Sequence, residues 1–456
     1  MTERKTLLFL ALAMALAGCG DDDGSTTGVM DAGDPPTDGA MPDGEMPDGE
    51  MPDGGPDPVL AALPDTATFG VVSSGDGVAS VGFLDASGDV AVDVWIDSGT
   101  MPPELTATLG GDVVLATETP EGTVTLLDRF GADLITRFTT GGVFIGQGRF
   151  TPESVSLNLQ DAVILPDGRG FVSRFGQNPD GGAAAEDRGS DLIGFDPATL
   201  ETTGERIDLS VFNLQSDGID PETGDPVSDV NVLARPGRIV RRGDTLVVGL
   251  GRLPASFTGP RASGPGAVAL VATGGLDATL FELPGGLANC DQVLPVLGSA
   301  TDVIVSCKGY SNLGFGEETG TRETVGIVRL SIAASGEASV VSSWEAATAD
   351  GPLAGWNTLS LGGDVVATVA FGDFVAETDD ELLRIDLSTG DVSVIATGAG
   401  QFVLSQGAFT EGGPLLVPDG AMGAIRRFTP AGEGFTEETA VTIGPPTLTI
   451  RSIAAL

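Results

Sequence analysis

The residues that could carry chemistry are few, and the cysteines are the most informative of them. The chain of 456 residues has no histidine and three cysteines, Cys19, Cys290 and Cys307. Without histidine it lacks the usual general base near neutral pH and the commonest transition-metal ligand. Cys19 stands alone near the N-terminus, and the other two are too few for a zinc or iron–sulfur site. The sequence therefore predicts no cofactor and no Ser–His or Cys–His catalytic pair.

Cys19 ends an apolar N-terminal stretch. Arg4 and Lys5 precede about a dozen apolar residues that end in Leu16-Ala17-Gly18-Cys19. The stretch is too short to span a bilayer of about 30 Å as a helix, and it has the parts of a secretory signal. Its ending resembles the lipobox of bacterial lipoproteins. That resemblance implies that residues 1–18 are a signal peptide and that Cys19 is lipidated at the mature N-terminus. Gly20 comes next instead of Asp, which by resemblance to enterobacterial sorting favours the outer membrane.

The composition limits the partners. The chain has 65 Asp and Glu residues against 22 Lys and Arg, so nucleic acid and anionic membrane surfaces are poor partners. No later segment approaches 18 consecutive apolar residues, so we expect the lipid to be the only membrane attachment. We expect a monomer. The acidic, lysine-poor composition fits a salty habitat or drift in a GC-rich genome, and the sequence does not separate the two.

Residues 19–58 have the composition of a disordered tether. Pro, Gly and Asp dominate, and a Met-Pro-Asp-Gly-Glu unit starts at Met41 and Met46 and, imperfectly, at Met51. Such a segment cannot form a core, and its like charges favour an extended chain. We therefore expect a spacer between the lipid and a globular domain that covers residues 59–456.

The domain has an all-β pattern. Runs of five to eight Val, Thr, Leu and Ile residues alternate with Gly, Asp and Pro turns. The hexapeptide Leu-Gly-Gly-Asp-Val-Val occurs at residues 109–114 and again at 361–366, and we expect both copies to be tight turns between two strands. A second turn signature follows in several units, as at Asp85, Asp128, Asp196 and Asp386. The shortest spacing, from Asp85 to Asp128, is 43 residues.

This repeat resembles that of seven-bladed β-propellers of the YVTN-repeat and quinoprotein-like kind. The resemblance implies seven four-stranded antiparallel blades. The first unit, residues 67–99, holds three strands, and residues 447–456 hold one strand left over. We expect that C-terminal strand to complete the first blade and close the ring.

The other two cysteines lie on one predicted hairpin. With its turn centred between Gly298 and Ser299, counting outward pairs residue 292 with 305 and Cys290 with Cys307. Direct cross-strand neighbours have Cβ atoms about 4.5–5.5 Å apart, which favours a disulfide in an exported protein.

We expect long insertions on one face of the propeller. Residues 176–190, 252–266, 308–324 and 372–380 fall between second and third strands, and residues 211–229 fall between blades three and four. A propeller brings these slots to the same face, so we expect ligand binding there. The candidate ligand-binding residues on that face are Arg174, Arg188, Arg252, Arg261, Tyr310, Asn312 and Arg322. Guanidinium groups could hold an anion, but each Arg could equally pair with a carboxylate of this acidic protein.

One insertion is dense in carboxylates. Asp217, Asp220, Glu222, Asp225 and Asp229 could supply oxygen ligands to calcium. Their spacing does not match Asp-x-Asp-x-Asp-Gly, so the alternative is a solvated acidic loop.

Three functions remain open at this stage. The sequence favours a non-enzymatic binding or scaffolding module on the cell envelope, with an envelope protein, peptide or glycan as partner. The resemblance leaves an enzyme as an alternative, lactonase-like or quinoprotein-like, working with carboxylates and Arg instead of His. A purely structural surface protein is the third.

Overall fold

The computed structural model describes residues 59–456, apart from residues 103, 130, 153, 257, 312–320, 347–350, 373–376 and 433. These residues belong to one compact unit that begins at Pro58. The predicted signal peptide (1–18) and tether (19–58) lie outside the described residues. The described part of the chain has no helix long and apolar enough to cross a membrane.

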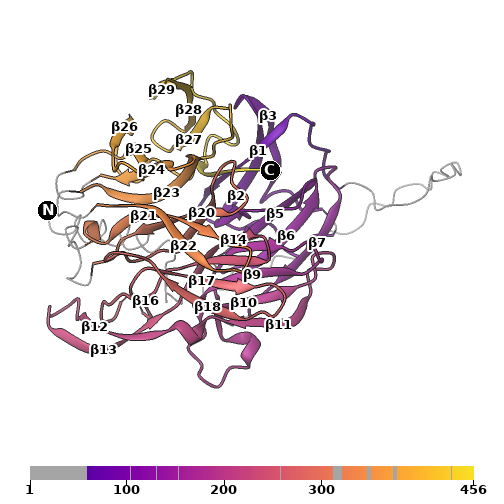
Figure 1. Ribbon diagram of the computed structural model, residues 1–456. Helices are drawn as coiled ribbons and strands as arrows, with labels where there is room; N and C mark the ends of the chain where they lie inside the picture. The colour runs from indigo at the N-terminus through magenta and orange to yellow at the C-terminus, as the bar shows by residue number, and fades with distance from the viewer. Residues whose placement is uncertain are drawn as a thin grey trace, which may run out of the picture. The chain divides into compact units, whose positions relative to one another are not determined.

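Seven antiparallel sheets form the blades of a β-propeller, and the chain passes through them in order (Figure 1). From the innermost to the outermost strand, blade one consists of β30 (Thr449–Ala455), β1 (Ala67–Gly75), β2 (Val78–Asp85) and β3 (Val90–Asp97). Blade two consists of β4 (Val113–Leu115), β5 (Thr123–Asp128), β6 (Leu134–Thr139) and β7 (Phe144–Arg149). Blade three consists of β8 (Leu159–Ile164), β9 (Gly170–Gln177), β10 (Gly189–Phe195) and β11 (Thr202–Asp208).

The remaining blades follow the same order. Blade four consists of β14 (Pro236–Arg242), β15 (Thr245–Leu250), β17 (Ala267–Ala272) and β18 (Ala278–Glu282). Blade five consists of β19 (Gln292–Pro295), β20 (Asp302–Lys308), β21 (Val325–Ile332) and β22 (Ala338–Glu345). Blade six consists of β23 (Leu353–Gly362), β24 (Val365–Phe371), β25 (Glu381–Asp386) and β26 (Val392–Thr397). Blade seven has β27 (Leu415–Asp419), β28 (Ala424–Ala431) and β29 (Gly434–Glu437), and isolated bridges from Leu404 and Ala408 to β27 mark its inner edge.

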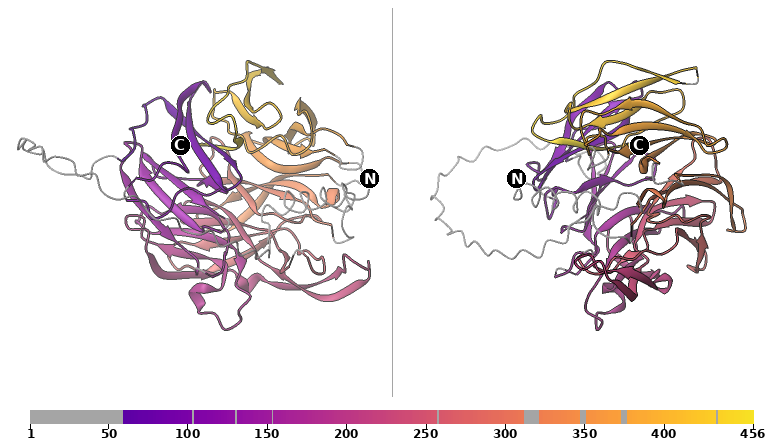
Figure 2. Two further views of the ribbon diagram at one scale, coloured as in Figure 1. Left: turned by 180° about the vertical axis from the view of Figure 1, so that it is seen from behind. Right: turned by 90° about the vertical axis from the view of Figure 1, so that its left-hand side faces the viewer.

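The C-terminal strand closes the ring, as predicted. β30 pairs antiparallel with β1 and becomes the innermost strand of blade one. In Figure 2 the C-terminus lies among the indigo strands of that blade. Because β30 covers the free edge of β1, the first blade has four strands although the chain starts it with three.

The core lies between the blades. Seven clusters of buried apolar side chains each join two neighbouring blades, including the last and the first. Between blades one and two, the ring of Trp95 lies edge-on to Phe83 and Phe138, with centroids 5.4 and 5.3 Å apart. Trp95 also donates its indole N–H to the carbonyl of Ala61 over 2.7 Å. Both faces of a strand such as β15 are buried, because each blade packs against the blade on either side, which agrees with the runs of apolar residues in the sequence.

The insertion between blades three and four is not a plain loop. Residues 214–233 form an antiparallel hairpin of β12 (Leu214–Ile219) and β13 (Pro226–Leu233). A third strand, β16 (Leu253–Pro254), comes from the insertion of blade four and pairs with β13. This accessory sheet is seen at the lower left of Figure 1. The expectation of a loop over residues 211–229 is therefore wrong, because two insertions share one small sheet.

The repeated hexapeptide adopts two conformations. Gly362 and Gly363 have φ values of 105° and 58° and form the tight turn between β23 and β24. Gly110 and Gly111 are not among the positive-φ glycines, and residues 109–112 lead into β4 instead of joining two strands. Asp128 likewise ends β5, so its turn joins the second and third strands, whereas Asp85 and Asp386 join the third and fourth. The spacing from Asp85 to Asp128 therefore compares unlike turns, although the count of seven blades holds.

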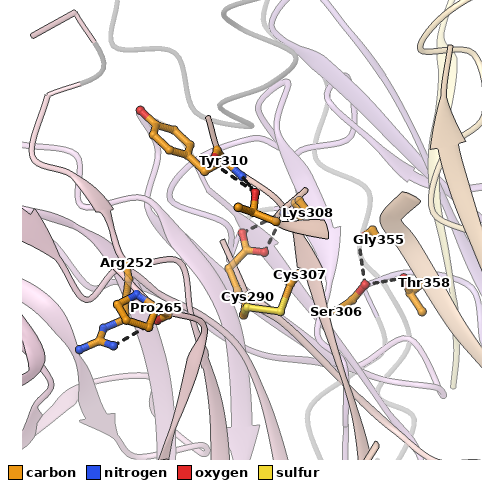
Figure 3. Close-up of a disulfide and its surroundings, with 11 residues drawn as sticks. Arg252, Pro265, Cys290, Ser306, Cys307, Lys308, Tyr310, Gly355 and Thr358 are labelled. Atoms are coloured by element: carbon orange, nitrogen blue, oxygen red, sulfur yellow. Dashed lines mark hydrogen bonds and ion pairs between the residues drawn. A yellow bond between two sulfur atoms is a disulfide. The ribbon is translucent and has the colours of Figure 1, made fainter. Parts of the chain in front are cut away.

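The predicted disulfide is present, but its predicted register is wrong. Cys290 and Cys307 are bonded, with Cα atoms 4.0 Å apart (Figure 3). In the ladder Gln292 pairs with Ser306 and Val293 with Val305, one residue away from the expected register. Cys290 lies before β19 and bridges to Leu250 of blade four. The bond therefore connects the entry of an inner strand to the end of the next strand.

Candidate binding site

The four insertions between second and third strands lie where the sequence predicts them, in blades three to six. Their Arg residues, however, mostly hold the fold together. Arg174 is 1% exposed and donates from Nε and Nη2 to the two carboxylate oxygens of Asp191, both over 2.7 Å. Its Nη1 donates to the carbonyl of Phe150 over 2.9 Å. A side chain buried with these partners cannot bind a ligand at the surface. The prediction that Arg174 binds a ligand is therefore wrong, and Arg174 forms an ion pair in the core.

Arg252 is also buried. Its Nη1 donates to the carbonyl of Pro265 over 3.1 Å (Figure 3). The carboxylate of Glu282 lies 3.5 Å from the same nitrogen. Burial lowers the pKa of Arg252, and the charge of Glu282 acts in the opposite direction. Arg252 therefore fastens the insertion of its own blade rather than facing solvent.

Arg261 and Tyr310 are the two candidates that come together. The Arg261 guanidinium lies 5.9 Å from the centre of the Tyr310 ring, and both side chains are half-buried. Burial raises the pKa of the Tyr310 hydroxyl and lowers the pKa of Arg261. Arg188 is exposed and donates to the carbonyl of Ala183, and Arg322 donates to that of Gly351. Asn312 lies outside the described residues.

The five carboxylates proposed as calcium ligands, Asp217, Asp220, Glu222, Asp225 and Asp229, are spread along the β12–β13 hairpin. Asp220 accepts the backbone N–H groups of Glu222 and Thr223, so its carboxylate stabilises the hairpin turn. Among the residues that the structure describes, no three Asp, Glu, Cys or His side chains converge as a metal site. The structure thus does not bring these carboxylates together.

A different site lies on the axis of the propeller, where two hydrogen bonds each join blades that are not neighbours. Gln292 of blade five donates its side-chain amide to that of Gln406 in blade seven over 3.1 Å. Arg238 of blade four donates from Nη1 to the hydroxyl of Thr117, which follows the inner strand of blade two, over 2.9 Å. Because each contact spans the position of the blade between, both cross the central channel.

Asp161 joins three blades beside Arg238. Its carboxylate is fully buried and accepts the backbone N–H groups of Thr117 over 2.9 Å and of Ile239 over 3.0 Å. It therefore ties blades two, three and four together. Burial raises the pKa of Asp161, and the charge of Arg238 and the N–H donors counteract that effect.

A β-bulge determines the direction of each of the side chains of Arg238 and Asp161. The register of β14 shifts between Pro236 and Ile239, and that of β8 shifts between Leu159 and Ala162. A bulge turns a side chain out of the regular alternation. Arg238 and Asp161 lie in these two bulges, between residues that pack into the core on either side.

Two adjacent cavities occupy the channel. The inner one has a volume of about 350 Å³ and is lined by inner-strand residues, among them Arg238, Leu294, Leu359, Gln406 and Ser452. The outer one, about 970 Å³, is lined by the turns that follow the inner strands, among them Glu118, Pro166, Gly243 and Thr301. Both cavities share Thr117 and Ala455. The opening therefore lies on the face of short turns, opposite the face that we expected to bind.

Searches for relatives by sequence find none: no family model and no curated protein matches the chain. Solved structures do match. A 6-phosphogluconolactonase candidate from Bacteroides fragilis has 10% identity and a TM-score of 0.54, with 86% of this chain and 98% of that chain covered. The likeness shows the fold. Virginiamycin B lyase from Staphylococcus aureus (13% identity, 72% and 84% covered, TM-score 0.40) and AztD from Citrobacter koseri (11%, 86% and 98%, 0.41) are more distant.

The sequence analysis missed the channel residues. Arg238 and Asp161 each stand directly before a run of apolar inner-strand residues, which is the only local signal for them. The contact between Arg238 and Thr117 depends on the path of residues 116–122, which cross toward blade four after the three-residue strand β4.

Proposed function

We propose that this chain is an exported, lipid-anchored binding protein whose propeller holds a small ligand in its central channel without transforming it. The cavities in the channel support this proposal. The inner cavity, about 350 Å³, lies within the range of about 300–1,000 Å³ typical of small-molecule sites. Its lining joins apolar side chains to directional groups such as Arg238 and Gln406.

The carboxylates near the channel have structural partners, which favours binding over catalysis. Asp161 accepts three backbone N–H groups, from Thr117, Ala162 and Ile239. Glu118 accepts the Nη1 of Arg242 over 3.0 Å and the backbone N–H of Arg241 over 2.9 Å. A general base needs a free acceptor within reach of the substrate. Asp161 is fully buried, and Glu118 is held in an ion pair with Arg242, so neither carboxylate is arranged for that role.

The anchor is proposed from the lipobox alone. Cys19 would carry the lipid, residues 20–58 would space the propeller from the bilayer, and the outer membrane would be the favoured location. Cys19→Ser should leave the precursor uncleaved or release the protein into the soluble fraction. A mutant that is cleaved normally and still fractionates with membranes would overturn the anchor.

Channel binding can be tested without knowing the ligand. A library of fluorinated fragments is observed by ¹⁹F NMR with the wild-type protein and two variants. Ala454→Phe enlarges a side chain that lines the inner cavity and also packs against the core between blades one and two, so its melting curve must match that of the wild type. Val394→Phe places the same ring on the outer strand of blade six, where Val394 is 53% exposed. We expect fragments that bind wild type and Val394→Phe but not Ala454→Phe. Identical fragment sets for all three proteins would contradict channel binding.

A further inference from the structure

The charges that line the channel have the opposite sign to those of the whole protein. The side chains lining the two cavities include three guanidinium groups, those of Arg238, Arg241 and Arg242, and one carboxylate, that of Glu118. The complete chain carries 65 acidic against 22 basic residues. The buried carboxylate of Asp161 offsets the charge of Arg238, so the channel is less acidic than the rest of the protein and offers guanidinium donors to an anion.

Of these cations, Arg238 and Arg241 are the least engaged, with one side-chain hydrogen bond each to the described residues, and of the two only Arg238 lines the inner cavity. Arg242 pairs with Glu118 over 3.0 Å and also donates to the carbonyl of Asp302. Arg238 makes one hydrogen bond to the described residues, to Thr117, and has no carboxylate among them within 4.0 Å. A guanidinium has five N–H donors, so most of those of Arg238 are left for a ligand. The nearby Asp161 balances the charge of Arg238. The carboxylate oxygens of Asp161 accept hydrogen bonds from backbone N–H groups instead of from Arg238.

A second polar group in the inner cavity lacks a partner. The hydroxyl of Ser452 is buried and has no hydrogen-bond partner among the described residues, and the residue is 8% exposed. Ser452 lines the same cavity as Arg238. The oxygen itself is enclosed by protein atoms, so this hydroxyl does not present a hydrogen-bonding group to a ligand in the cavity.

The rest of the inner wall is apolar. Leu294, Val296, Leu359 and Phe409 lie along it, in blades five to seven; blade five adjoins blade four, which carries Arg238, and blade seven lies across the channel from it. The Gln292–Gln406 contact lies near the start of β19, at the end of the channel away from the short turns. A ligand that enters from the outer cavity thus meets cations and then an apolar wall.

We propose that the ligand is an anionic amphiphile: a carboxylate, held by Arg238, on an apolar chain that lies against Leu294, Leu359 and Phe409. This rests on the proposed function, because it assigns a ligand class to the same cavity. A bidentate guanidinium–carboxylate pair supplies the specificity, and burial of the chain supplies most of the affinity. The ligand enters through the outer cavity, past Arg241, on the short-turn face.

The test compares two probes of equal chain length, decanoate and decanol, by isothermal titration calorimetry. Arg238→Gln removes the cation, Arg238→Lys keeps the charge without the planar fork, and Arg451→Gln removes an exposed cation next to Ser452 as a matched control. Melting curves of all variants report whether each remains folded. We expect Arg238→Gln to weaken decanoate by about 10- to 100-fold and decanol by less than about threefold. Arg238→Lys should fall between, and Arg451→Gln should bind as wild type.

The outcomes separate the two proposals. Equal affinity for decanoate and decanol, both lost in Ala454→Phe, would overturn the anionic ligand and leave channel binding intact. Loss of decanoate in Arg451→Gln as well would also overturn it, because the effect would then be one of overall charge. If neither probe binds and the fluorinated fragments also fail to distinguish Ala454→Phe, the proposed function falls with it. Should Arg238→Gln not fold, Arg238→Lys decides on the same comparison of probes.

Discussion

At the residue scale, most of the charged side chains that look functional in the sequence belong to the fold. Arg174 is the clearest example: Asp191 takes both its Nε and Nη2 donors, and Arg206 contacts the same carboxylate. A buried ion pair of this kind is costly to break, because the remaining partner keeps an uncompensated charge. A chain with three times as many acidic as basic residues has a carboxylate available for nearly every Arg, which explains why the Arg candidates were poor guides to a ligand.

The disulfide should contribute measurably to stability. Cys290 and Cys307 close a loop with a separation of 17 residues, and the chain-entropy model gives about 3 kcal/mol for such a loop. We expect the reduced wild-type protein to lose about that much free energy of unfolding relative to the oxidised protein in urea titrations. Equal unfolding midpoints with and without reductant would contradict the contribution, and free thiols in exported protein would contradict the bond.

Asp302 should make stability depend on acid pH. Burial alone would raise the pKa of this carboxyl, but hydrogen bonds from Arg329, Thr301 and Ser331 outweigh burial and hold the pKa below its ordinary 3.8. A lowered folded-state pKa stabilises the protein above the unfolded value, and that stability is lost as pH falls through the folded value. Asp302→Asn should therefore destabilise at pH 7, by about 1–3 kcal/mol, and much less near pH 2. The exposed Asp76→Asn is the control, and a pH-independent effect of Asp302→Asn would contradict the ion pair.

At the scale of elements, the two copies of Leu-Gly-Gly-Asp-Val-Val show that one local sequence can adopt two conformations. Gly363 has φ 58° and nothing within 4 Å of an added Cβ, whereas a Cβ at Gly111 would meet the backbone of Gly75 and Gly77 at 2.9 Å. The same letters thus serve a turn in one place and a close approach of two chain segments in the other. Only the tertiary context distinguishes them.

The difference between these glycines can be measured. Gly363→Asn should be tolerated, because Asn adopts positive φ readily and the turn is open. Gly111→Asn should lower stability by about 1–3 kcal/mol, because two backbone segments must move apart. Thermal melts of the two variants provide the comparison. A larger loss for Gly363→Asn than for Gly111→Asn would contradict the assignment of the two conformations.

The propeller could be predicted from sequence because its blades are local. Runs of apolar residues separated by turns such as Pro166-Asp167-Gly168 indicate each hairpin. Together with the resemblance to propellers, they predict the blade count, the ring closure and the insertion slots. The channel site could not be predicted in this way. Arg238 and Thr117 are separated by 121 residues, and their meeting depends on a bulge in β14 and on the short β4. Neither feature has a sequence signature as strong as a turn.

At the scale of the whole molecule, the ring is stabilised by its closure. β30 pairs with β1, and the N–H of Ile453 also donates to the carbonyl of Gln406 in blade seven over 2.8 Å. One strand thus connects the last blade to the first. The same strand carries Ser452 and Ala454 to the cavity, so closure and the proposed site depend on the same ten C-terminal residues.

A proline in this strand should open the ring. Ile453→Pro removes the N–H that Gln406 accepts and disturbs the pairing with β1, which we expect to cost about 3 kcal/mol or more. The control Ile453→Val keeps the backbone bond and should cost about 0.5–1.5 kcal/mol for one methylene group. Urea unfolding followed by tryptophan fluorescence measures both. Equal losses for the two variants would show that closure by β30 contributes little.

The central claim is that the channel, entered from the short-turn face, is the binding site. The most direct test is a crystal structure of the protein with 10-bromodecanoate, in which anomalous scattering locates the bromine without bias from the coordinates. We predict one strong bromine peak in the inner cavity, between Leu294 and Phe409, with the carboxylate at Arg238. Bromine peaks found only on the long-loop face or on the outer strands of the blades would contradict the account.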